Sequence, residues 1–129
     1  MEVIRVKDTE ARRGERFTGT AWVDALLKAQ QPKGMRVFRV FFDPGARTHW
    51  HAHEGEQTLY VVEGRGRVQK SGDRAVEIGP GDVVYIAPGE RHWHGAGPQG
   101  PMIHLAVTSG GETAWMDEVT DEEYTRDFS

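Results

Sequence analysis

The sequence of 129 residues contains no cysteine and no asparagine. Without cysteine the chain can form no disulfide, has no thiolate to offer a metal and has no cysteine nucleophile. It needs no disulfide to fold, because a chain of this length can bury a sufficient core. The lack of heat-labile residues, together with twelve arginines against four lysines, fits a thermophilic source and equally a GC-rich genome.

Long apolar runs and an excess of basic charge are also missing. No stretch approaches the roughly 18 apolar residues that span a membrane. The N-terminal stretch MEVIRVKDTEARRGER is charged and lacks the apolar segment of a secretory signal. We therefore expect a cytoplasmic protein with no membrane partner. The net charge of −4 and the pI near 5.8 do not indicate the basic surface of a nucleic-acid-binding protein, so no nucleic-acid partner is expected.

Glycine and proline divide the chain into short segments. The sixteen glycines and six prolines cluster between apolar or β-branched runs, a spacing typical of an all-β sandwich or barrel. This spacing leaves no room for the long helices of an α/β fold. We expect one all-β domain covering residues 1–129. The expected strands are Val3–Val6, Thr18–Val23, Arg36–Phe42, Thr58–Val62, Gly66–Lys70, Val83–Ile86 and Met102–Thr108.

Two short helical segments are expected. Thr120 followed by Glu123 is the pattern of a capping box, and the acidic first turn favours a helix start. This pattern predicts a short C-terminal helix over Asp121–Arg126. The segment Ala25–Gln30 is interpreted as a helical turn.

All six histidines lie in the middle of the chain, at positions 49, 51, 53, 92, 94 and 104. Residues two apart in a strand point to the same face. His49, His51 and His53 are therefore expected to share one face, as are His92 and His94. A single histidine is more often a surface or satisfied core residue, but a cluster with this spacing indicates a metal site.

The spacing of these residues resembles the two motifs of the cupin family. Gly45, His51, His53, Gln57 and Gly64 match the first motif, G-x5-H-x-H-x3–4-E-x6-G, except that Gln57 replaces the usual Glu. The segment Gly81–His92 matches the second, G-x5-P-x-G-x2-H, with Ala87 in place of the proline. The motifs cover residues 45–96. The resemblance implies a double-stranded β-helix, or jelly-roll barrel, with a metal inside.

The resemblance also implies the metal ligands, namely His51, His53, Gln57 and His92. An amide oxygen at Gln57 can ligate a divalent ion but cancels none of its charge. The metal would therefore be a stronger Lewis acid and would suit oxygen-activating iron less well. An alternative is that Gln57 reflects a loss of function.

A narrower resemblance extends over most of the chain. The segments Pro44–Thr48, Pro88–Ala96, His104–Ala106 and Val119–Tyr124 are similar to a bacterial subgroup of small cupins. That subgroup includes the manganese-dependent cupin hydroxynitrile lyases and the cupins associated with carboxymuconolactone decarboxylases. The resemblance implies manganese as the cofactor, one divalent ion per chain, although an imidazole-rich site also accepts Fe, Ni, Zn, Co or Cu.

Two further histidines are candidate catalytic residues. His104 lies in an apolar strand and is ranked first as a general base, and His94 is ranked second. Each has an alternative role in orienting a ligand histidine. His49 is expected at the rim of the site. Trp50 and Trp93 are expected to face away from it and pack in a core or interface. By alternation, the expected apolar walls of the pocket are Phe38, Val40, Phe42, Leu59, Val61 and Leu105.

Three functions are considered. The first is a metal-dependent lyase acting on a small hydroxyl or carbonyl compound, with cyanohydrin cleavage and synthesis implied by the resemblance. The second is an oxidative cupin that uses oxygen or peroxide, and the third is a non-catalytic cupin that binds a small ligand. A free base beside the metal favours catalysis over the third. The expected partners are a small-molecule substrate and further copies of the chain, in a homodimer or larger homo-oligomer that uses strand edges or the N-terminal arm.

Overall fold

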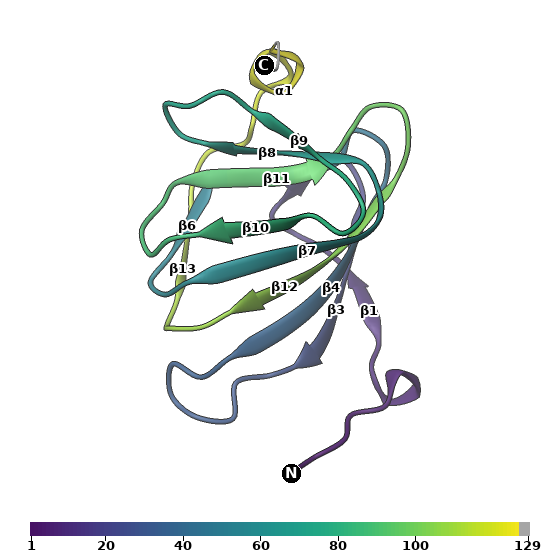
Figure 1. The fold of residues 1–129 in the computed structure, drawn as a ribbon, viewed down its shortest axis with the longest axis vertical. Helices are drawn as coiled ribbons and strands as arrows, with labels where there is room; N and C mark the ends of the chain where they lie inside the picture. Colours follow the sequence, from purple (N-terminus) through teal and green to yellow (C-terminus); the bar gives the residue numbers. More distant parts are fainter. Residues whose placement is uncertain (127–129) are drawn as a thin grey trace.

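The computed structural model describes residues 1–126, which fold into two antiparallel sheets (Figure 1). The strands are β1 (Ala11–Arg13), β2 (Phe17–Thr18), β3 (Ala21–Leu27), β4 (Arg36–Phe42), β5 (Arg47–Thr48), β6 (His51–His53), β7 (Gln57–Gly64), β8 (Gly66–Lys70), β9 (Val76–Ile78), β10 (Val83–Ile86), β11 (His92–Ala96), β12 (Met102–Thr108) and β13 (Thr113–Trp115). The helical elements are a 3₁₀ turn, η1 (Val6–Asp8), and α1 (Asp121–Thr125). The predicted all-β jelly roll is confirmed.

The two sheets are built from different strands, and the hydrophobic core lies between them. The six-stranded sheet has the order β1-β3-β4-β12-β7-β10. The seven-stranded sheet has the order β13-β6-β11-β5-β2, with β8 paired to β11 and β9. Alternate residues of β12 are buried and half-buried along its whole length, as expected of a strand with one face on the core. One hydrophobic core cluster includes Phe42, Val61 and Met102, and another includes Leu59 and Ile86.

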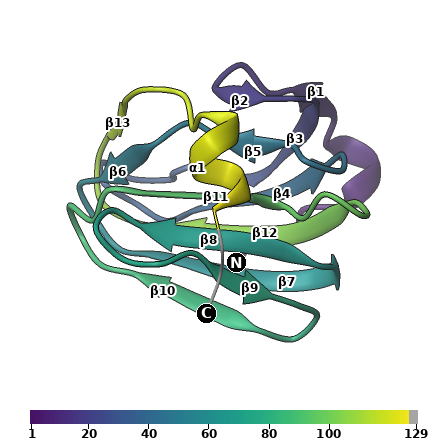
Figure 2. The ribbon, with the colours of Figure 1, turned by 90° about the horizontal axis from the view of Figure 1, so that it is seen from above.

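The C-terminal helix covers the outside of the seven-stranded sheet. Seen from above, α1 lies over β11 and beside β5 (Figure 2). The predicted capping box is present, since the Thr120 side chain accepts a hydrogen bond from the Glu123 backbone N–H and the Glu123 side chain accepts one from Thr120. The Tyr124 hydroxyl donates to the Ala96 carbonyl at 2.6 Å. The Arg47 guanidinium pairs with Asp121 at 2.8 Å. These contacts fix the helix on the sheet that carries His51, His53 and His92.

Three predicted elements differ in the structure. Val3–Val6 is not a strand, because no neighbouring strand pairs with it, and only Val6 belongs to a helical element. The expected helical turn at Ala25–Gln30 is wrong: its first residues belong to β3, where Ala25 pairs with Phe38 of β4. The expected strand Thr18–Val23 is split at Gly19, which has φ of 80° and turns the chain from one sheet to the other.

Membrane-spanning helices are not found among the described residues, since none of their helices has the necessary length and apolar character.

Candidate metal centre and its cavity

Three histidines from two paired strands meet inside the barrel. β6 supplies His51 and His53 and β11 supplies His92, and the antiparallel pairing places His92 opposite His51. One ring nitrogen from each lies within 4.8 Å of the others. All three side chains are buried. This three-histidine cluster is a group that could hold a metal ion.

The far side of each ring is held by a hydrogen bond. His51 Nδ1 lies 2.8 Å from the His49 carbonyl oxygen, and His92 Nδ1 lies 2.8 Å from that of Glu90. A carbonyl only accepts, so both Nδ1 atoms carry the hydrogen and leave Nε2 as a lone pair. His53 Nδ1 lies 2.9 Å from Thr113 Oγ1. Its Nε2 is buried and has no hydrogen-bond partner within residues 1–126. The lone pairs of His51 and His92 and the unpartnered Nε2 of His53 fit a divalent cation, because metal-bound histidines are held in this way.

Gln57 presents its amide oxygen to the same cluster. Its Oε1 lies 3.3 Å from His92 Nε2, while its amide nitrogen donates to Thr108 Oγ1 at 2.8 Å. With the amide nitrogen toward Thr108, the amide oxygen is the end that faces the histidines. The structure therefore brings the four residues His51, His53, Gln57 and His92 together, with nitrogen and oxygen donors suited to a first-row divalent metal.

His94 and His104 form a hydrogen-bonded pair beside the cluster. His104 Nε2 lies 3.0 Å from His94 Nδ1. Phe42 packs edge-on against both rings. The other two nitrogens, His94 Nε2 and His104 Nδ1, are buried and have no partner within the described residues. The His94 ring also contacts the rings of His51 and His92, so the pair adjoins the three-histidine cluster directly.

Burial keeps these imidazoles neutral. Burial lowers the pKa of His104 to about 4. Burial, with the charge of His92, lowers the pKa of His53 to about 4. Burial is also the largest cause of the lowered pKa of His51, His92 and His94, and neighbouring imidazoles lower the pKa of His51 and His94 further. Neutral imidazoles are the form that binds metal and accepts protons at neutral pH.

A cavity of about 540 Å³ opens beside these residues. Its walls come from both sheets and combine apolar side chains with the histidines. The lining residues are Phe17, Val23, Arg36, Phe38, Val40, Thr48, His51, His53, Gln57, His94, His104, Ala106, Thr108, Glu112, Thr113 and Trp115. The volume suits a small organic molecule.

The predicted apolar wall is right in part. Phe38 and Val40 line the cavity, whereas Phe42, Leu59 and Val61 are buried in the core clusters. The expectation for Leu105 is wrong. It neighbours His104 in β12, and strand alternation turns its half-buried side chain to the outer face. The prediction missed Phe17 and Trp115, whose segments carry no pattern that identifies them as cavity walls.

The remaining residues of the histidine segments lie outside the cluster. His49 falls between β5 and β6, and its Nε2 lies 3.7 Å from Glu118 Oε1. It therefore does not share the face of His51 and His53 as expected, because regular strand structure is interrupted there. Trp50 and Trp93 are buried in a separate core cluster, as predicted.

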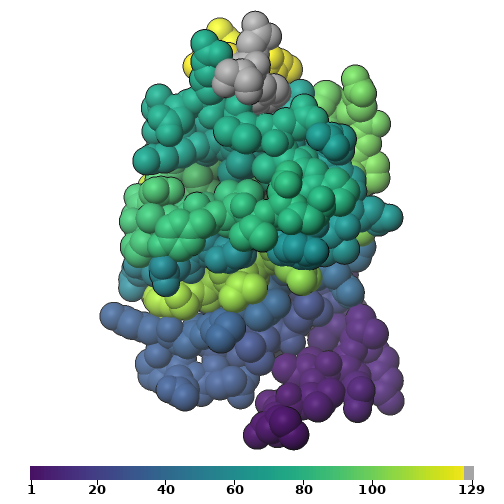
Figure 3. All heavy atoms as spheres, in the orientation of Figure 1, coloured from purple at the N-terminus to yellow at the C-terminus, as the bar shows by residue number. Residues whose placement is uncertain are grey.

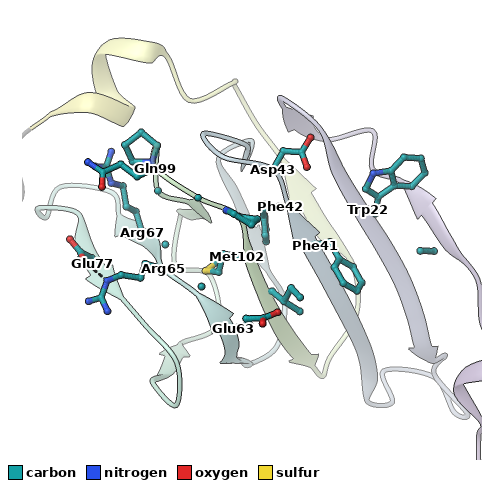
Figure 4. A pocket seen from close by; sticks show the side chains of 18 residues that line it. Trp22, Phe41, Phe42, Asp43, Glu63, Arg65, Arg67, Glu77, Gln99 and Met102 are labelled. Atoms are coloured by element: carbon teal, nitrogen blue, oxygen red, sulfur yellow. Dashed lines mark hydrogen bonds and ion pairs between the residues drawn. The ribbon is translucent and has the colours of Figure 1, made fainter.

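A larger cavity lies elsewhere in the molecule. Its volume is about 970 Å³, and it is formed where β7 ends and β12 begins. Figure 4 shows Trp22, Phe41 and Met102 around it, with Arg65 paired to Glu77. No histidine lines it. The smaller cavity is the candidate functional site because it alone of the two contains the histidines.

The two-sheet barrel with histidines at its centre defines a jelly-roll protein with a candidate metal site. A family model described as "Cupin domain" matches residues 38–108. The chain belongs to the cupin family.

Named relatives and solved structures agree with this membership. The chain is 46% identical to an (R)-mandelonitrile lyase of Granulicella tundricola, covering 98% of this chain and all of the relative. It is 31% identical to an L-ectoine synthase of Bordetella parapertussis, covering 83% of this chain and 82% of the synthase. A cupin-like protein of Thermotoga maritima superposes with a TM-score of 0.82 at 40% identity, covering 88% of this chain and 92% of that one. Relatives named as enzymes indicate enzymatic activity for this chain.

Proposed function

We propose that the chain is a metal-dependent lyase that cleaves and forms small cyanohydrins. Its metal ligands are His51, His53, Gln57 and His92, and the cofactor is one divalent ion, manganese. The 46% identity to an (R)-mandelonitrile lyase over the full length supports the reaction. The inward lone pairs of His51 and His92 and the buried, unpartnered Nε2 of His53 support the ligand set. A divalent metal bound there supplies Lewis acidity toward a substrate hydroxyl or carbonyl oxygen.

The proton chemistry of the proposed reaction belongs to the pair His94 and His104. Cleavage removes the hydroxyl proton and breaks the C–CN bond. The bonding electrons leave with cyanide, which takes up a proton to give hydrogen cyanide, while the carbonyl forms. One hydrogen lies between His104 Nε2 and His94 Nδ1. If His104 donates it, His104 Nδ1 is a base and His94 Nε2 carries a hydrogen. If His94 donates, the roles exchange.

This tautomeric link carries the proposal for catalysis. In either neutral state the pair holds one basic nitrogen and one N–H donor, and both outer nitrogens lack a protein partner. When a proton binds to His104 Nδ1, the shared hydrogen can pass to His94 Nδ1 and a proton can leave from His94 Nε2. Both rings are then neutral again. A free base beside the metal ligands favours an enzyme over a passive binding protein. The direct test is release of benzaldehyde from mandelonitrile by manganese-loaded protein. No release above that of metal-free protein would contradict the proposal.

The neutral amide of Gln57 is expected to tune the metal. Replacing Gln57 with Glu keeps an oxygen donor but adds a negative charge at contact distance from the metal. Metal content is expected to stay equal or rise, because a charged oxygen is the better ligand for a divalent ion. The lyase rate is expected to fall at least about tenfold, because partial neutralisation reduces Lewis acidity. Metal analysis and steady-state kinetics on the same preparation measure both effects.

The matched comparison for this variant is Gln57→Asn, which keeps the neutral amide but shortens the side chain. It separates charge from geometry, because it is expected to weaken metal binding rather than lower the rate per bound metal. An unchanged lyase rate in fully loaded Gln57→Glu would show that charge at this position does not tune the metal. A gain in oxygen consumption by that variant would favour the oxidative alternative for its chemistry.

We also propose that the chain forms a homodimer through the outer face of the six-stranded sheet. Five apolar or aromatic residues on β3, β7 and β10 alternate with buried or half-buried residues, and each is more than 40% exposed: Trp22, Tyr60, Val62, Val83 and Tyr85. Exposed large apolar side chains gathered on one sheet face are typical of an association surface. The first residues of the chain, purple in Figure 3, project from one end of the molecule with exposed apolar side chains. A symmetric partner would cover both.

Light scattering at micromolar concentration is expected to give a mass about twice the 14.5 kDa of the chain. Val62→Lys together with Val83→Lys is expected to shift the protein toward monomer, because it places charge in the apolar face. Val76→Lys, at an exposed position of the other sheet, is the control and is expected to leave the mass unchanged. A wild-type mass of 14.5 kDa would contradict the proposal.

A further inference from the structure

Arg36 is a charged residue on the inner face of a barrel strand. It is the first residue of β4 and lines the histidine cavity with Phe38 and Val40, the next residues of the same face. Thr108 of β12 pairs with Arg36 on one side and with Gln57 of β7 on the other. Adjacent strands lie about 4.8 Å apart, so the Cα atoms of Arg36 and Gln57 are separated by about 10 Å. Arg36, Thr108 and Gln57 therefore lie side by side on three neighbouring strands, with the guanidinium at one end and the amide at the other.

The Arg36 guanidinium has no hydrogen-bond or ion-pair partner among the described residues. Arg36 Nη2 is buried and makes no hydrogen bond within residues 1–126. Glu112 lines the same cavity, but the described residues show no ion pair between the two side chains. Arginine keeps its charge at all relevant pH values. Arg36 as a whole is half-buried, with Nη2 as its buried end. Because a partly desolvated cation gains from a nearby opposite charge, the cavity beside Nη2 suits an anion.

The charge of Arg36 lies in the same cavity as the histidines that are proposed to carry out the reaction. Arg36 lines the same cavity as His53, Gln57 and His104. Apolar side chains including Val23 and Ala106 lie along the same cavity. A ligand with an anionic group at Arg36 could therefore place an apolar body along this wall and a second polar group at the histidines.

We propose that Arg36 is a carboxylate-binding residue and that the substrates of this cavity are small aldehydes or their cyanohydrins that carry a carboxylate. The carboxylate is the fitting anion because the planar guanidinium can donate two parallel hydrogen bonds to its two oxygens. The identity of the reacting group rests on the proposed lyase function, whereas the carboxylate site rests on Arg36 and its cavity. A neutral cyanohydrin would leave the guanidinium unpaired.

The test compares two pairs of aldehydes that differ in charge and hardly in shape. 3-Formylbenzoate and 4-formylbenzoate are each measured against the matching formylbenzamide, by calorimetric titration of the manganese-loaded protein. At least one benzoate is expected to bind about tenfold or more tightly than its amide. Arg36→Met is expected to abolish this preference, and Arg36→Lys to keep part of it as a point charge. Arg65→Met, which removes an arginine of the other cavity, is the control and is expected to keep the preference.

Thermal unfolding distinguishes ligand binding from a structural role. Arg36→Met loses no hydrogen bond at Nη2, so its unfolding temperature is expected to be no lower than that of the wild type. A marked drop would identify Arg36 as structural and overturn the inference, as would equal binding of benzoate and amide by the wild type. Cleavage of mandelonitrile without a benzoate preference would refute the inference and leave the proposed function intact. An Arg36-dependent benzoate preference without cleavage would refute the lyase function and leave the carboxylate site intact.

Discussion

Replacing His53 with alanine is expected to empty the metal site while the barrel stays folded. His53 contributes a buried Nε2 with no hydrogen-bond partner among residues 1–126, and its loss leaves two imidazoles and one amide. Removal of one of four ligands is expected to reduce metal content to below about a tenth of the wild-type value after dialysis. Cyanohydrin cleavage is expected to fall to the level of the metal-free protein. Elemental analysis and circular dichroism on the same sample measure metal and fold together.

The fold is expected to survive because the hydrophobic core lies elsewhere. The cluster that includes Phe42, Val61 and Met102 contains no histidine, and its burial does not depend on a bound ion. His49→Ala provides the matched control. It removes an imidazole two residues from His51 but keeps the backbone carbonyl that accepts the His51 hydrogen bond. Full metal content is expected in His49→Ala. Full occupancy in His53→Ala would refute the assignment of His53 as a ligand.

The grouping of the three histidines could be predicted because it depends on short-range spacing. His51 and His53 are two apart in a strand, and this period places them on one face. Their approach to His92 depends on the pairing of β6 with β11. The local sequence does not determine this strand pairing. It could be predicted only from the resemblance to a family with the same two motifs.

The same rule failed where the strand was interrupted. His49 was assigned to the face of His51, but β5 ends at Thr48 and β6 begins at His51. The chain turns between them so that Trp50 packs in the core cluster under α1. The break is caused by tertiary packing, which period-two reasoning cannot detect.

Arg36 was missed although the alternation contained the signal. Phe38 and Val40 were correctly assigned to the pocket, and Arg36 is the preceding member of the same face. A charged residue at the start of a strand is usually solvated, so the pattern was followed only through its apolar members. The N-terminal Val3–Val6 shows the opposite error. Its composition suits a strand, but a strand forms only where another strand offers hydrogen bonds.

Replacing His104 with alanine is expected to lower the turnover of mandelonitrile by about 10² to 10⁴, the usual contribution of a positioned base. His104 is wholly buried and its lowered pKa of about 4 keeps it neutral and able to accept a proton across the physiological range. The wild-type rate is therefore expected to stay level from pH 8 down to about 5. It is expected to fall as pH approaches 4, where His104 becomes protonated and can no longer act as a base.

The pair with His94 makes a second expectation possible. Because one hydrogen links His104 Nε2 to His94 Nδ1, loss of either ring breaks the exchange of protons between the two outer nitrogens. His94→Ala and the double variant are expected to lose about as much rate as His104→Ala alone, since residues that act as a unit are not additive. Metal content in His104→Ala is expected to match the wild type, which separates a lost base from a lost ligand. His104→Gln places a polar group at this position but no base. Compared with His104→Ala, it is expected to be more stable to unfolding but no faster in turnover.

Two outcomes would contradict these expectations. A metal-loaded His104→Ala protein with the wild-type rate would show that His104 takes no part in the chemistry. Full activity in His94→Ala would show that the proton does not pass between the two rings.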